Sequence, residues 1–183
     1  MGEAMNIFYL HEDPIQNAKW HIDKHIVKMP IEYAQLMSTA HRLLDGEMYL
    51  GKTAIGRNIK RWRLHDERED ILYKASHVNH PSAIWVRESI TNYFQMYKLY
   101  MATLIEFTNR YGKIHGASKP SLMLMRPPKN IPPKVGTEMP QAMPEYCKVK
   151  GNPIQAYRNY YINEKKRFAT WKNKEVPKWF EMI

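Results

Sequence analysis

The apolar positions of the first 112 residues recur every three or four residues, which is the spacing of one helix face. The first such face follows Asp13-Pro14, where Asp13 is expected to cap a helix and Pro14 to occupy its first turn. The pattern continues to Asp45-Gly46 with Pro30 inside it, so we expect a kink at Pro30 or two abutting helices. The apolar positions of this face are Ile15, Ile22, Ile26, Met29, Tyr33, Leu36, Met37, Ala40 and Leu44.

Turn signals divide the remainder of this first part. Residues 46–65 predict a basic, glycine-punctuated connection, and an acidic stretch predicts a short helix from residue 66 to about residue 77. Asn79-His80-Pro81-Ser82 is expected to break that helix and to cap the next one, which ends at Gly112.

Proline dominates the following segment, with seven prolines from Pro120 to Pro144. It predicts an extended arm that wraps over the surface or reaches outward. Asn152-Pro153 is expected to cap a last helix. We therefore expect an all-α fold and a single domain over residues 1–183, made of a helical core (1–112), a proline-rich arm (113–150) and a basic C-terminal helix and tail (151–183).

Composition narrows the class of protein. The chain has 183 residues, of which 44% are hydrophobic, and its single cysteine excludes an intramolecular disulfide framework. No apolar run approaches the roughly 18 residues of a membrane span, and no signal-peptide pattern opens the chain. We expect a cytoplasmic protein without a membrane partner.

Charge is distributed unevenly around a net value of +10. Residues 1–112 carry 14 basic and 13 acidic side chains, whereas residues 113–183 carry 14 and 5. A basic field of this kind attracts polyanions, and nucleic acid is the commonest such partner, so DNA is the expected partner. The alternative is that the charge serves only solubility.

His21 and His25 stand four residues apart, so they share a helix face and have the spacing of metal ligands. The sequence between them lacks the glutamate of the zincin motif. The alternative is that one histidine is a polar residue on the helix face and the other is packed or hydrogen-bonded. We expect no metal or other cofactor.

Glu32 follows Pro30 beside apolar neighbours, where a carboxylate with a raised pKa can act as an acid or base. A structural salt bridge with Lys24 or Lys28 is the alternative. Asn79 and His80 mark a helix start, and Arg87 is placed to meet a phosphate or Glu32. The catalytic candidates expected around one cleft are Glu32, His21, His25, Asn79, His80 and Arg87.

The last helix mixes aromatic and basic side chains, a combination typical of surfaces that stack on bases and follow phosphates. Part of its aromatic set also fits a core-facing stripe. The candidate nucleic-acid contacts are Lys24, Lys28, Arg61, Arg158, Tyr160, Lys165, Lys166 and Arg167.

Three stretches together resemble a known family: D-K-H-I-V-K-M-P-I-E-Y-A-Q-L at residues 23–36, N-H-P-S-A-I-W at 79–85 and I-E-F-T-N-R-Y-G at 105–112. They are similar to the pyrimidine-dimer DNA glycosylases of the endonuclease V type, in their phage and bacterial branch. The likeness covers roughly Asn6 to Gly112.

This resemblance implies a compact helical enzyme that cleaves the glycosyl bond of a damaged pyrimidine and then nicks the strand. It implies that Glu32 is the catalytic glutamate and that an N-terminal amine is the nucleophile. The matching segment here begins at Met5 or Asn6, which leaves residues 1–4 as an extension, so we expect no imine adduct from the chain that starts at Met1.

A DNA glycosylase is thus the leading hypothesis, with or without strand-nicking activity. A non-enzymatic nucleic-acid-binding phage accessory protein is the second, and a metal-dependent hydrolase built on the histidine pairs is the third.

Overall fold

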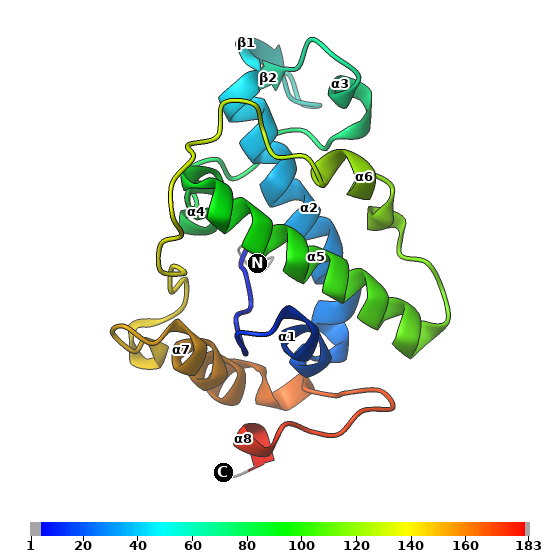
Figure 1. The fold of residues 1–183 in the computed structure, drawn as a ribbon, viewed down its shortest axis with the longest axis vertical. Helices are drawn as coiled ribbons and strands as arrows, with labels where there is room; N and C mark the ends of the chain where they lie inside the picture. The colour runs from blue at the N-terminus through cyan, green and yellow to red at the C-terminus, as the bar shows by residue number, and fades with distance from the viewer. Residues whose placement is uncertain (1–4, 182–183) are drawn as a thin grey trace.

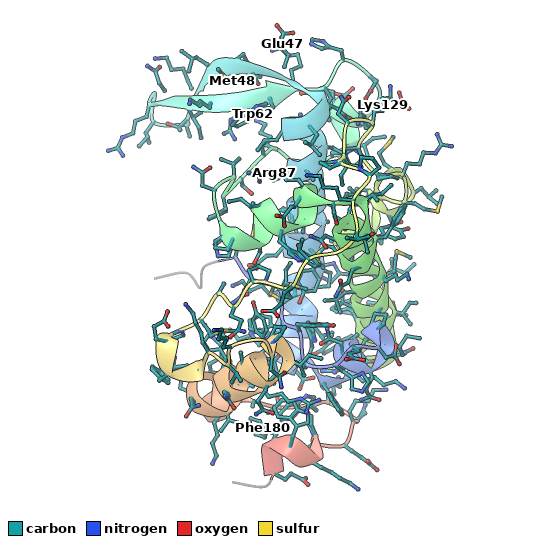
Figure 2. All side chains as sticks on the ribbon, turned by 60° about the vertical axis from the view of Figure 1, so that its left-hand side comes forward. Glu47, Met48, Trp62, Arg87, Lys129 and Phe180 are labelled. Carbon is teal, nitrogen blue, oxygen red and sulfur yellow. The ribbon has the colours of Figure 1, made fainter. Side chains whose placement is uncertain are left out.

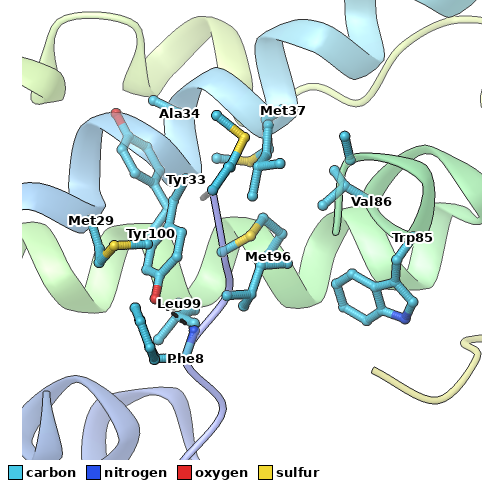
Figure 3. Packing of buried hydrophobic residues seen from close by; sticks show 14 of the residues in the cluster. Phe8, Met29, Tyr33, Ala34, Met37, Trp85, Val86, Met96, Leu99 and Tyr100 are labelled. Carbon is cyan, nitrogen blue, oxygen red and sulfur yellow. Dashed lines mark hydrogen bonds between the residues drawn. The ribbon is translucent and has the colours of Figure 1, made fainter. Parts of the chain in front are cut away.

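Two long helices form the frame of the molecule in the computed structural model, which describes residues 5–181. Helix α2 (Asp23–Asp45) and helix α5 (Ile90–Tyr111) pack against each other and cross in Figure 1. Helix α4 (Pro81–Glu88) lies against both of them. Between these helices lies an apolar core that includes Met37, Val86 and Met96 (Figure 3).

The chain enters this frame through an extended segment, residues 5–10, followed by α1 (Pro14–Trp20). Asp13 caps α1 as predicted, its side chain accepting the Ile15 N–H. The expectation of two abutting helices that meet at Pro30 is wrong, because α2 continues through Pro30 and the interruption falls at His21-Ile22, where the backbone is extended. Pro30 is buried, and removal of its apolar surface from water offsets the hydrogen bond that it cannot make.

The expected connection over residues 46–65 is a β-hairpin, so the fold is mostly helical rather than purely all-α. Strands β1 (Glu47–Lys52) and β2 (Asn58–Arg63) pair antiparallel, with Glu47 opposite Arg63 and Lys52 opposite Asn58. The hairpin projects from the end of α2 (Figure 1). Its residues are exposed or half-buried on both faces, so it lacks the apolar-polar alternation that reveals a strand.

Two further helix boundaries differ from the predicted ones. Helix α3 (Arg68–Ile71) is one turn long, because the chain after it bonds to α2: Ser38 and Thr39 accept the N–H groups of Tyr73 and Ser76. The helix that ends at Gly112, where φ is 64°, is divided at Ser89, whose hydroxyl accepts the Asn92 N–H and caps α5.

Short helical turns interrupt the proline-rich arm, namely η1 (Gly116–Ser118), α6 (Ser121–Leu124) and η2 (Glu145–Cys147). The arm runs over the surface as predicted: Asp45 accepts the N–H groups of Lys129 and Asn130, and the Ile90 N–H donates to the Pro132 carbonyl.

The C-terminal part begins with α7 (Pro153–Tyr160), capped by Asn152 as predicted. It continues as a π-turn, η3 (Tyr161–Lys165), then as η4 (Lys166–Phe168), and the last described helix is α8 (Lys178–Glu181). Within residues 5–181, no helix combines the length and apolar character that crossing a bilayer requires.

Candidate functional site

Phe8 lies at the centre of an aromatic and histidine cluster built from three parts of the chain. Its ring stacks on the imidazole of His25 with the centroids 3.9 Å apart, and it also contacts Tyr160 and Tyr161 from the C-terminal helix. Its backbone N–H donates to the hydroxyl of Tyr33 at 3.2 Å (Figure 3). The cluster therefore joins residues 5–10, α2 and the α7–η3 helix.

His21 is fully buried in this cluster and its neighbours fix its tautomer. Nδ1 lies 2.8 Å from the Asn17 carbonyl, which only accepts, so Nδ1 carries the proton. Nε2, 2.7 Å from the Tyr33 hydroxyl, then accepts from it. Burial lowers the pKa of His21 to about 3, so the ring is neutral near pH 7.

His25 is also fully buried, and its Nδ1 lies 2.7 Å from the hydroxyl of Tyr161. Burial lowers its pKa well below the ordinary value, and electrostatic interactions with His21, Lys165 and Lys28 that disfavour the protonated form act in the same direction. Both imidazoles, expected around one cleft, are 0% exposed. Their hydrogen bonds hold the hydroxyl groups of Tyr33 and Tyr161 in place.

Glu32 lies on α2 at the edge of the same cluster. One carboxylate oxygen is 3.2 Å from the ammonium group of Lys28, and the side chains of Lys28 and Glu32 are 34% and 13% exposed. The carboxylate is near enough to Tyr33 to help raise the pKa of that phenol, after the larger effect of burial. The salt bridge weighed in the sequence analysis is thus present, and Lys28 rather than Arg87 is the partner seen.

The other three catalytic candidates lie at the two ends of α4: Asn79 and His80 precede its first residue, and Arg87 is in its last turn. His80 caps the helix, its Nδ1 accepting the Ser82 N–H at 3.1 Å, and Asn79 is exposed on the turn before it. Arg87 lies on α4 below the hairpin in Figure 2, and burial lowers the pKa of its guanidinium. Among the described residues no hydrogen bond or ion pair joins any of the three to Glu32, so the structure does not gather the six catalytic candidates around one contact network.

The expected nucleic-acid contacts divide by exposure. Lys24, Lys166 and Arg167 are exposed, whereas Lys165 is 4% exposed, with its ammonium 4.7 Å from the centre of the Tyr160 ring. Arg158 donates to the Leu10 carbonyl and lies over Trp20. Burial thus contradicts the surface role expected of Lys165, because its aliphatic stem and charge are used in packing against aromatic rings.

Half-buried Tyr160 packs beside Phe8, and Arg61, also half-buried, lies on strand β2 of the hairpin. Lys28 is one of the candidate nucleic-acid contacts, and its partly exposed side chain also forms the ion pair with Glu32.

A separate cavity of about 420 Å³ lies on the other side of residues 5–10. Tyr9, Glu12, Gln95 and Lys98 line it together with apolar side chains, and it contains none of the predicted site residues. The alternation of the extended segment explains the separation, because Phe8 faces the histidines whereas Ile7 and Tyr9 face the cavity.

Sequence reasoning missed Phe8, Tyr33 and Tyr161 as parts of this site. Tyr33 and Tyr161 had helical spacing that indicated a core stripe, which their burial confirms. Their hydroxyl contacts with His21 and His25 had no sequence signal, because His25 and Tyr161 are 136 positions apart.

Arg110 connects two of the three family-like stretches. Its guanidinium donates to Glu106 and to Asp23, both at 2.9 Å, and to the Lys19 carbonyl at 3.0 Å. Asp23 also accepts the N–H of Lys172. These pairs hold the start of α2, the end of α5 and the C-terminal segment together, which gives the third stretch a structural role.

Comparison of the chain with protein-family models, with curated proteins and with solved structures finds no match. The expectation about an N-terminal amine concerns residues 1–4, which lie outside the described residues. For the metal alternative, no group of three or more histidine, cysteine, aspartate or glutamate side chains suited to a metal ion occurs within residues 5–181.

Proposed function

We propose that this protein binds DNA and cleaves the N-glycosyl bond of a damaged or modified base, with Glu32 as the carboxylate at the sugar. The observation that carries the proposal is a single helix face that bears Lys24, Lys28 and Glu32 at intervals of four residues. Exposure falls along it, from exposed Lys24 through half-buried Lys28 to Glu32, whose side chain is 13% exposed.

This order of charges suits one nucleotide and its backbone. Residues four apart on a helix are separated by about 6 Å along its axis, which is close to the spacing of successive phosphates. Lys24 and Lys28 are therefore placed to bind successive phosphates, while the carboxylate, one turn beyond Lys28, meets the sugar that follows them along the strand. Cleavage of a glycosyl bond develops positive charge on the sugar, and a nearby carboxylate stabilises that charge.

The buried cluster supports this face from behind. Tyr33 follows Glu32 directly and is held by Phe8 and His21, which restricts the helix turn that carries the carboxylate. Pre-organised charge is most effective where it does not have to reorganise during the reaction. The sequence resemblance independently assigns the catalytic role to the same glutamate.

A non-enzymatic nucleic-acid-binding protein is the second candidate. The observation that favours it is the Lys28–Glu32 pair itself, at 3.2 Å, which gives the carboxylate a structural partner. In that case the lysines bind phosphate and Glu32 only orients Lys28.

The test is Glu32→Gln, which keeps the size of the side chain and removes its charge. We expect release of bases from UV-irradiated or base-modified duplexes to fall about a thousandfold. Because a pair of this kind contributes only about 0.3–0.5 kcal/mol, the melting temperature should change little. Duplex affinity should remain within about threefold of the wild type.

Glu138→Gln is the matched control, because Glu138 is exposed on the arm and the substitution makes the same change in charge. It should leave base release unchanged. A Glu32→Gln variant that melts earlier but keeps normal activity per folded molecule would support the structural pair and refute the catalytic role. A wild type that binds duplex DNA and releases no base from any substrate would establish the accessory function instead.

A further inference from the structure

The β-hairpin is an exposed, basic element of the molecule. Residues 47–63 contain five basic side chains and one acidic side chain, Glu47. Within the described residues, none of positions 47–63 belongs to the hydrophobic core or packs against it. Figure 2 shows the ribbon standing clear of the helices, with side chains on both of its sides.

The hairpin is nevertheless held in a fixed direction at its base. Arg42 of α2 donates to the Trp62 carbonyl at 2.9 Å, and the Leu64 N–H donates to Glu69 at 2.7 Å. Gly46 joins α2 to β1 where an added Cβ would lie 2.5 Å from the Arg42 carbonyl oxygen. The ribbon is therefore anchored to the end of α2.

The tip is ordered as well. The Thr53 N–H donates to the Arg57 carbonyl at 2.8 Å, and the Thr53 hydroxyl accepts the Arg57 N–H at 3.0 Å. Gly56 supplies the left-handed backbone, with φ of 79°. An isolated two-stranded hairpin is marginally stable in water, so one kept rigid at both ends is suited to act as a preformed binding element.

The cations lie on both faces of the ribbon. Directly paired residues share a face, so Tyr49 and Arg61 lie on one side, whereas Leu50 and Lys60 lie on the other. Arg57 lies at the tip, next to Ile55, which is 75% exposed. A flat partner such as a membrane or a protein surface contacts one face, whereas a groove with phosphates on both walls contacts two.

We propose that the hairpin inserts into the major groove of duplex DNA, with its basic side chains on the phosphates of both walls. A major groove about 12 Å wide admits a two-stranded ribbon, and six residues per strand extend about 20 Å along it. The exposed apolar side chain at the tip, Ile55, then faces base edges and thymine methyl groups. This inference deepens the proposed function and rests on it for the identity of the partner.

The test measures duplex affinity by fluorescence anisotropy across a range of salt concentrations, in the Glu32→Gln background so that no chemistry intervenes. Arg57→Gln combined with Lys60→Gln should raise Kd about tenfold at physiological salt and lower the magnitude of the salt slope by about 2, since two phosphate contacts are lost. Both side chains are exposed, so the melting temperature should not change.

Lys113→Gln combined with Lys119→Gln is the matched control, because both lysines are exposed, lie outside the hairpin and remove the same charge. The control should keep the wild-type Kd and salt slope. Equal losses in the two double variants would mean that only net charge matters, and an unchanged Kd in the hairpin variant would mean that the hairpin does not touch DNA. Either result overturns the inference.

Two further arms separate this inference from its rivals and from the glycosylase proposal. Anionic phosphatidylserine vesicles should not bind, and vesicle binding that depends on the hairpin in the absence of duplex binding would overturn the inference. Base release is assayed separately, with Glu32 intact. Duplex binding that depends on the hairpin, without any base release, refutes the glycosylase proposal and supports the hairpin inference. Base release with a Kd that does not depend on the hairpin supports the glycosylase proposal and refutes the hairpin inference.

Discussion

His41 lies between Arg68 and Tyr93, and its environment fixes its tautomer as it does for His21. The Arg68 guanidinium donates to Nδ1 at 2.9 Å. The Tyr93 hydroxyl donates to the Leu124 carbonyl, so its oxygen accepts from Nε2 at 2.9 Å. Burial lowers the pKa of His41 to about 4, which leaves the ring neutral near pH 7.

These neutral histidines predict that stability depends on pH. In the unfolded chain a histidine has a pKa near 6.5, whereas the folded values are about 3 for His21 and about 4 for His41. The unfolded state therefore binds more protons below pH 6.5, and the free energy of unfolding falls as pH decreases from about 6.5 towards 4. The expected slope is on the order of 1 kcal/mol per pH unit for each histidine, measured by urea titration between pH 8 and pH 5.

Variants of the His21–Tyr33 pair separate the effect of histidine protonation on stability from the effect of packing. His21→Gln retains hydrogen-bonding groups but cannot titrate, so the slope should fall by the contribution of one proton. Tyr33→Phe removes the hydroxyl beside Nε2 and keeps the imidazole, so it should lower stability at every pH and keep most of the slope. A wild-type stability that stays constant from pH 8 to pH 5 would contradict the neutral assignment.

Among single-residue contacts, the sequence predicted those between residues close in the chain and missed those between residues far apart in the chain. The Lys28–Glu32 pair follows from the spacing of four residues on a helix, and the structure confirms it. The burial of His25 depends on Phe8 and Tyr161, which packing brings together from separate segments. No periodicity within one helix encodes that encounter.

Helix starts and ends were predictable where a single residue supplies the reason. Asp13 and Asn152 cap helices through their own side chains, and Gly112 ends one through its backbone. The break at Ser89 was missed because the apolar pattern continues across it. The hairpin was missed because its strands bury neither face, so their composition indicates only a polar connection.

Asn152 provides a test of capping at an exposed position. Its side chain accepts the Gln155 N–H at 3.0 Å, which satisfies one donor at the start of α7. Asn152→Ala should lower the free energy of unfolding by about 1 kcal/mol, as judged from chemical denaturation.

Asn152→Asp is the matched control because a carboxylate accepts the same N–H and also interacts favourably with the positive end of the helix dipole. Its stability should equal or exceed that of the wild type. Equal losses in the two variants would show that Asn152 stabilises the chain by some contact other than the cap.

The whole molecule places its basic regions at opposite ends of the long axis. The hairpin lies at one end, and α7 and α8 lie at the other, where exposed Lys166 and Arg167 follow the π-turn (Figure 1). The helix face of Glu32 belongs to α2, which runs between the two ends. The positive charge is therefore divided between the two ends of the molecule. The hairpin supplies one share, although it belongs to residues 1–112, which are almost neutral overall.

This arrangement predicts that a single duplex touches both ends in one bound state. Arg57→Gln with Lys60→Gln and Lys166→Gln with Arg167→Gln should each raise Kd about tenfold, and the quadruple variant should raise it about a hundredfold. The magnitude of the salt slope should fall by about 2 in each double variant and by about 4 in the quadruple one. The effects add because the two sites are distant and share no contacts.

The measurement is anisotropy of a labelled duplex in the Glu32→Gln background, with melting temperatures to confirm that every variant is folded. Two alternative bound states, each using one end, predict a different pattern. Each double variant would then lose at most half of the binding, because the other end still holds the duplex, and only the quadruple variant would bind weakly. That pattern would exclude the single arrangement, in which the phosphates held at the two ends position one nucleotide beside the carboxylate on α2.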